Sequence, residues 1–147
     1  MALRRGEDPT GRLGREVQEL IDELWQVPRF SGSRRGFRPQ VDVVRVEEPP
    51  GFRVVVEIPG IDPEAVRLYA DANTLVVAGD RNRPAEGRYF HMEIAYGPFQ
   101  RRIQFSEQVD PSRATADYRR GLLTIALPLA EHAPARERVV IQVGRPS

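Results

Sequence analysis

The clearest indication of the fold is the alternating stretch Phe52-Arg53-Val54-Val55-Val56-Glu57-Ile58-Pro59-Gly60. Apolar residues at positions 52, 54, 56 and 58 are separated by Arg53, Val55 and Glu57. A spacing of two residues places the first set on one face of an extended strand. Pro59-Gly60 then provides a turn. The stretch therefore predicts a β-strand with one buried face.

Short extended runs of the same kind lie on both sides of this stretch. Most of the prolines between residues 49 and 128 fall at the ends of these runs, where a missing N–H does no harm to a sheet. Several short strands without an intervening helical pattern predict an all-β antiparallel sandwich. The remaining runs contain Val41, Val43 and Val46; Val66, Leu68 and Ala70; Leu75 to Ala78; Phe99, Ile103 and Phe105; and Leu123, Ile125 and Leu127.

The first segment, residues 1–38, carries a helical pattern instead. Apolar residues recur with helical spacing and predict an amphipathic helix over about 13–26, which Pro28 ends. A connector rich in Gly, Ser and Arg follows. Two interpretations remain open: the helix packs on its own domain, or it forms an arm that binds other subunits or unfolding client proteins. The residues of the stripe are Val17, Leu20, Ile21, Leu24 and Trp25.

The connection between Gly79 and Phe99 is too long for a simple hairpin, and connections of this length usually have a purpose. Its flank of Pro and Gly lets the middle project from the domain. We predict that the middle forms a strand that pairs with another subunit, an exchange that produces dimers. The residues of this predicted exchange strand are Tyr89, Phe90, His91, Met92 and Glu93.

The last segment, residues 130–147, begins with a polar spacer and contains a short apolar strip. Ile141 and Val143 lie on the same face of an extended segment, before Gly144 and Pro146 end it. Such an isolated pair is a poor element for a core. It suits binding along the edge of another subunit's sheet, where backbone hydrogen bonds give affinity and alternate side chains fill pockets. Assembly is therefore the leading functional hypothesis.

The composition of the 147 residues argues against an enzyme. The chain has no cysteine and no lysine, which excludes thiol and lysine nucleophiles and a P-loop lysine. Its two histidines, His91 and His132, have no partners at catalytic or metal-binding spacing. No cofactor is expected. The net charge of +1 is evenly spread, which argues against nucleic acid as the main partner. Lacking an apolar leader or membrane span, the protein is expected to be cytoplasmic.

Several motifs of the sequence resemble those of the small heat-shock proteins, the α-crystallin-domain family. Ala116-Asp-Tyr-Arg-Arg-Gly-Leu-Leu123 is similar to the family's A-x-x-x-n-G-x-L signature, with Arg120 where Asn is usual. Pro39 to Asp42, Glu57 to Ile61 and Tyr96 to Arg101 also resemble family stretches, and Ile141-Gln142-Val143 is similar to the C-terminal I-x-I/V anchor.

The resemblance implies an immunoglobulin-like β-sandwich over residues 39–129, between an arm (1–38) and an extended tail (130–147). It also implies an ATP-independent chaperone that holds unfolding proteins and assembles into oligomers of dimers. The exchange strand would pair with the partner's edge near Val41 and Val43, with Arg101 at the interface. The anchor at 141–143 would dock in a groove of a neighbouring dimer. The implied groove residues are Val66, Leu68 and Ala116.

Two other hypotheses come from different classes of function. A monomeric co-chaperone or interaction module has a similar sandwich, but typically lacks the long connection and the tail anchor. Single-stranded nucleic acid could bind the run from Phe99 to Phe105, where aromatic residues flank Arg101 and Arg102. However, the alternation places both phenylalanines on one face, which suits a core.

Overall fold

The computed structural model describes residues 36–84, 86–132 and 138–144. The predicted helix over about 13–26 and its stripe (Val17, Leu20, Ile21, Leu24 and Trp25) lie outside these residues. Within them the chain forms nine strands in two sheets and two short 3-10 turns, Pro63–Ala65 (η2) and Pro111–Arg113 (η3). The predicted all-β sandwich is confirmed.

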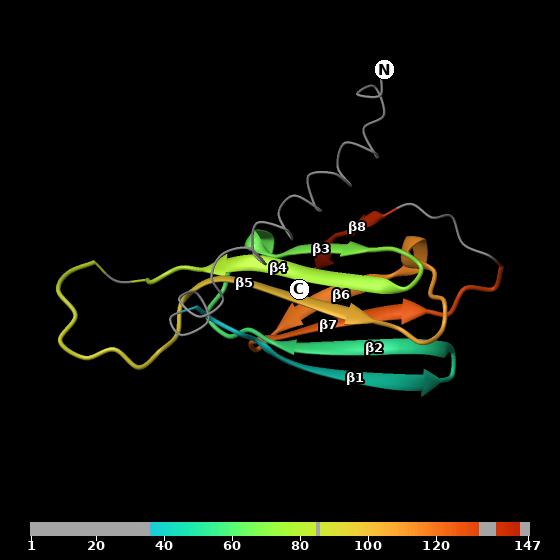
Figure 1. Ribbon diagram of the computed structural model, residues 1–147, viewed down its shortest axis with the longest axis horizontal. Coiled ribbons are helices and arrows are strands. Elements are labelled where there is room, and N and C mark those ends of the chain that lie inside the picture. Colours follow the sequence, from blue (N-terminus) through green and yellow to red (C-terminus); the bar gives the residue numbers. More distant parts are fainter. Residues whose placement is uncertain (1–35, 85, 133–137, 145–147) are drawn as a thin grey trace, which may run out of the picture.

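The first sheet has five strands in the order β1-β2-β7-β6-β9, and the second has four in the order β5-β4-β3-β8. Figure 1 shows the two sheets as stacked layers, with β1 at one margin and the β4–β5 connection extending beyond the end of the sandwich. The strands are β1 (Gln40–Glu47), β2 (Pro50–Glu57), β3 (Arg67–Ala70), β4 (Thr74–Arg81), β5 (Gly97–Gln104), β6 (Thr115–Arg119), β7 (Leu122–Pro128), β8 (Val139–Ile141) and β9 (Val143–Gly144).

The alternation of β2 builds the core. Val54 pairs with Ile125 of β7 and Val56 with Leu123, and all four side chains are buried between the sheets. Leu68, Leu75 and Val77 of the second sheet pack in the same cluster. Each fully buried aliphatic side chain of this kind stabilises a fold by about 1.5–3 kcal/mol. The period-two pattern in the sequence therefore corresponds directly to the packed face of each sheet.

Local polar contacts hold the connections between strands. At the β3–β4 turn the Asp71 carboxylate accepts hydrogen bonds from the backbone N–H groups of Asn73 (2.9 Å) and Thr74 (2.8 Å), an Asx turn. At the β6–β7 turn Arg120 has φ +55° and Gly121 has φ +83°, both left-handed. Asn adopts this left-handed conformation more readily than Arg does. The usual Asn of the signature is therefore explained by the backbone conformation of the turn.

Tyr118 connects the two hairpins of the first sheet. Its phenolic O–H donates to the backbone carbonyl of Ile58 over 2.8 Å, while the N–H of Ile58 donates to the carbonyl of Gly121 over the same distance. The end of β2 is therefore fastened to the β6–β7 turn. Strand β6, which contains Ala116 and Tyr118, was not among the strands predicted from alternation.

Candidate functional site

Strand β1 is an open edge of the first sheet. It pairs with β2 along its whole length, and among the described residues nothing pairs with its other side. Val41 and Val43 point toward the second sheet, as do Val54 and Val56, their β2 partners in the register. However, Val43 retains 46% of its accessible surface. The edge therefore presents both free backbone groups and an apolar side chain, the combination that accepts an added strand.

The connection between β4 and β5 carries a second apolar surface. Phe90 is 96% exposed, and Met92 and Ile94 are also exposed. These three residues alternate along the chain, so an extended conformation would place them on one face. Tyr89, His91 and Glu93 alternate with them, and His91 Nε2 contacts a carboxylate oxygen of Glu93. The loop face, as we call Phe90, Met92 and Ile94, has no cover within the described part of the chain.

The predicted exchange strand is not a strand in the single chain. Residues 86–96 form bends and irregular structure with no ladder partner. This outcome has a physical reason: an isolated extended segment has no backbone partner until a second sheet edge supplies one. Ile94, which follows the predicted segment, continues the alternation of Phe90 and Met92.

Arg101 lies in β5 and contacts the entry of β1. Its Nη1 donates to the backbone carbonyl of Pro39 over 2.5 Å. Partial burial lowers the pKa of the Arg101 guanidinium, and the positive charge of Arg38 lowers it further. The residue therefore ties the second sheet to the edge strand of the first, next to the predicted dimer surface.

The apolar strip of the tail fills a groove between the two sheets. Ile141 of β8 pairs with Leu68 of β3, and Val143 of β9 pairs with Ala116 of β6. Ile141 is only 6% exposed, and together with Val66 it belongs to the main core cluster. The structure thus brings the predicted anchor and the three predicted groove residues together. We call Val66, Leu68 and Ala116, with the edges of β3 and β6, the tail groove.

One expectation about the tail differs from the structure. The strip was expected to be a poor core element that leaves its own sandwich, yet it packs against its own β3 and β6. The sheets leave their edges open at this side, so apolar surface and backbone groups are both available there. The strip occupies such a site, as Figure 1 shows for β8 beside β3.

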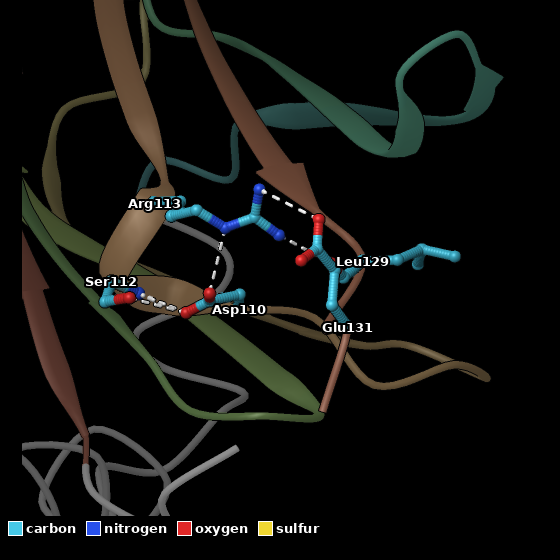
Figure 2. A network of polar contacts seen from close by, with 5 residues as sticks. All are labelled: Asp110, Ser112, Arg113, Leu129 and Glu131. Carbon is cyan, nitrogen blue, oxygen red and sulfur yellow. Dashed lines mark hydrogen bonds and ion pairs between the residues drawn. The ribbon is translucent and has the colours of Figure 1, made fainter. Parts of the chain in front are cut away.

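A polar network holds the point where the tail leaves β7 (Figure 2). Arg113 donates from Nη2 to the carbonyl of Leu129 (2.9 Å) and from Nε to the Asp110 carboxylate (2.9 Å). Asp110 also accepts from the N–H and hydroxyl of Ser112, and Glu131 lies 4.0 Å from Arg113 Nη1. Hydrogen bonds from Ser112 and Arg113 lower the pKa of the Asp110 carboxyl. The start of the tail is therefore fixed to η3.

A second ion pair holds edge strand β1. The Glu107 carboxylate accepts from Arg45 Nε (2.8 Å) and Nη2 (3.2 Å), which joins β1 to the loop after β5. The hydrogen bond to Arg45 is the main cause that lowers the pKa of the Glu107 carboxyl, and the one to Glu107 raises the pKa of Arg45. Both side chains are partly exposed, so the pair contributes more to geometry than to stability.

The described residues contain no group of three or more His, Asp or Glu side chains placed to hold a metal ion. None of the helices among them is long and apolar enough to cross a membrane. The aromatic residues of the run from Phe99 to Phe105 are both buried in the core. Their rings are therefore not available for stacking on nucleic-acid bases.

Comparison with known proteins agrees with this geometry. The model of the Hsp20/alpha crystallin family matches residues 44–144, which run from edge strand β1 to the end of β9. An 18 kDa heat shock protein of Streptomyces albus G is 33% identical over 97 residues, which cover 64% of this chain and 66% of that protein.

Solved structures show the same architecture. Heat shock protein 16.0 from Schizosaccharomyces pombe has a TM-score of 0.59 at 28% identity, covering 70% of this chain and 96% of that one. A small heat-shock protein from Xylella fastidiosa, described as having a distinct high order structure, has a TM-score of 0.56 at 31% identity. That match covers 72% of this chain and 95% of the other.

Proposed function

Because the chain belongs to the Hsp20/alpha crystallin family, we propose that it is an ATP-independent chaperone that binds unfolding proteins and prevents their aggregation. The observation that carries this proposal is the family match over residues 44–144, which includes the second half of β1 and all of the other strands. No catalytic step is part of it. Such a holdase requires only apolar surface and a means of covering that surface until it is needed.

The building block is a dimer made by exchange of the β4–β5 connection. In this proposal the segment Tyr89 to Ile94 of one copy adds to the free edge of β1 in the other. The exposed loop face and the exposed Val43 support the pairing, since each is an apolar surface without cover in the single chain. Backbone hydrogen bonds along β1 supply affinity, and alternate side chains supply register.

Higher assembly uses the tail. We propose that Ile141 and Val143 of one copy can occupy the tail groove of a neighbouring copy in the same way as they occupy their own. One such anchor buries two aliphatic side chains, about 3–6 kcal/mol before the cost of ordering the tail. A single anchor therefore exchanges readily, whereas many anchors in one particle act together. The arm stripe at Val17, Leu20, Ile21, Leu24 and Trp25 is proposed to bind clients.

The monomeric co-chaperone is not favoured, because the relatives found are heat shock proteins and the chain has both the long connection and the tail strip. The predicted location in the cytoplasm stays a prediction.

A scattering assay tests the function directly. An enzyme that aggregates on mild heating is mixed with the full chain, without nucleotide, and turbidity is followed over time. We expect suppression that rises with chaperone concentration and is unchanged by added ATP. Unreduced turbidity at a molar excess of the chain would overturn the proposal. An unrelated β-sandwich protein of similar size is the control for crowding.

A further inference from the structure

Arg81, the last residue of β4, is the one charged side chain buried among the described residues, at 8% exposure. It makes no ion pair to a carboxylate within those residues. A buried cation without a counter-ion is costly, so every N–H group needs a good acceptor. Its contacts therefore point to a specific task.

The guanidinium joins three separate segments through backbone carbonyls. Nε donates to the carbonyl of Ala95 over 3.1 Å, and Nη2 donates to the same oxygen. Nη1 donates to the carbonyl of Pro59 over 2.9 Å, in the turn after β2. Arg81 is the last residue of β4 and pairs with Gly97, the first residue of β5, while Ala95 lies inside the connection, two residues before β5. The side chain thus closes that connection at its base and fastens it to the first sheet.

Aromatic rings complete the site. The guanidinium carbon lies 3.7 Å from the centre of the Phe37 ring and 5.2 Å from that of Tyr96. Arg83, two residues into the loop, lies 5.0 Å from the Tyr96 ring and 5.1 Å from that of Tyr89. A planar, weakly hydrated guanidinium can stack on rings and donate in its plane at once, which an ammonium cannot.

We propose that Arg81 is the positioning residue of the exchange loop: it fixes the loop base so that the loop face projects toward a second copy of this chain. We define the loop base as Arg81, Ala95, Tyr96, Pro59 and Phe37. This inference rests on the proposed exchange of the loop. The contacts of Arg81 restrict the conformations of the loop in the free monomer. The loop therefore loses less conformational entropy when it pairs with a second copy, and the dimer forms at lower entropic cost. Figure 1 shows the loop extending away from the sandwich, as this role requires.

The test uses the full chain with Arg81→Lys and Arg81→Met. Arg102→Lys and Arg102→Met serve as matched controls, because Arg102 is exposed on the adjacent strand β5. Monomer and dimer fractions are measured on dilution by sedimentation with fluorescence detection. Amide hydrogen exchange is measured on the same samples. We expect both Arg81 variants to raise the dimer Kd about tenfold or more.

Hydrogen exchange separates positioning from general stability. In the Arg81 variants the amide of Gly97, which starts β5 opposite Arg81, should lose protection, while the amides of β2 and β7 keep it. The Arg102 variants should change neither quantity. Should Arg81→Met fail to fold, Arg81→Lys retains the charge and still loses the planar fork, so it decides the question. A wild-type dimer Kd in Arg81→Lys overturns the inference.

A further variant, Phe90→Ser with Ile94→Ser, separates this inference from the proposed exchange. A weakened dimer in this variant, together with an unchanged Kd in Arg81→Lys, leaves the exchange standing and refutes the role of Arg81. Wild-type dimerisation in the double-serine variant refutes the exchange itself, and the role of Arg81 with it.

Discussion

Ile141 lies directly opposite Leu68 in the antiparallel register of β8 and β3, and the two side chains share one core. The tail of the single chain therefore completes its own sandwich. The same contact in an assembly would join two copies, with no change in the groove or in the peptide that fills it. The chain's own tail and the tail of a neighbour would then compete for one site.

The first prediction concerns this anchor. Replacing Ile141 and Val143 together by Ala should reduce the assembly to dimers in size-exclusion chromatography with light scattering. The same change should lower the stability of the sandwich by about 2 kcal/mol or more, because Ile141 is buried. Gln142→Ala is the control, since Gln142 is exposed between the two anchors. A particle of unchanged mass in the double variant would show that the tail does not link subunits.

The second prediction concerns the edge strand. Val43→Asp should weaken the dimer, because a desolvated carboxylate on the apolar side of β1 opposes an incoming strand. The stability of the monomer should fall by about 1 kcal/mol, because Val43 is only partly exposed and Asp is disfavoured in strands.

Val44→Asp provides the matched control for the edge strand. Val44 is also exposed, but it lies on the opposite face of β1. Dimer fractions on dilution should therefore fall more for Val43→Asp than for Val44→Asp. Equal losses in the two variants would argue that the edge is not used through its inner face.

The third prediction concerns the β6–β7 turn. Gly121→Ala should destabilise the fold more than Gly60→Ala in urea unfolding. Both glycines have positive φ, so each alanine variant bears a strain of about 1–2 kcal/mol. Only at Gly121 would the new Cβ also lie 3.1 Å from the Cβ of Pro59, whereas Gly60 has open space. Equal losses would mean that Pro59 moves aside without cost.

The fourth prediction concerns pH. The folded-state pKa of Asp110 is lowered, so its carboxylate stabilises the fold above the ordinary Asp range, and this contribution is lost as pH falls through the folded pKa. The stability difference between wild type and Asp110→Asn should therefore be constant from neutral pH to about pH 5 and shrink below about pH 4. Urea unfolding at several pH values measures it. A difference that grows on acidification would contradict the assignment.

The sandwich could be predicted from the sequence because its strands alternate with period two and end at prolines or turn residues. Val54, Val56, Leu123 and Ile125 all point inward as the alternation requires. Strand β6 was not predicted from alternation, because it has a single buried residue, Ala116, between polar neighbours. A short strand of this kind is recognisable only through its partners on both sides.

Some residues of the candidate site could be predicted from the sequence, and others could not. The pairing of Ile141 and Val143 with Leu68 and Ala116 came from a family resemblance, since spacing alone names the anchor but not its groove. Arg81 gave no signal, because nothing in the sequence separates it from the other arginines. Its role depends on burial and on carbonyls from distant segments, which only the folded chain brings together.

The tail groove accepts the tail strip in one chain direction. The strip runs antiparallel to β3 on one side and parallel to β6 on the other, so its backbone pattern fits in one orientation only. In the proposed assembly, the tail of a donor copy would therefore have to enter the groove of the acceptor in this same direction. Such a link is heterologous when the two copies do not exchange tails with each other, and heterologous links close into rings and cages when their rotation allows, or otherwise continue as open filaments. In that assembly the length of the spacer between Leu129 and Val139 would limit which closed particles this polypeptide can build.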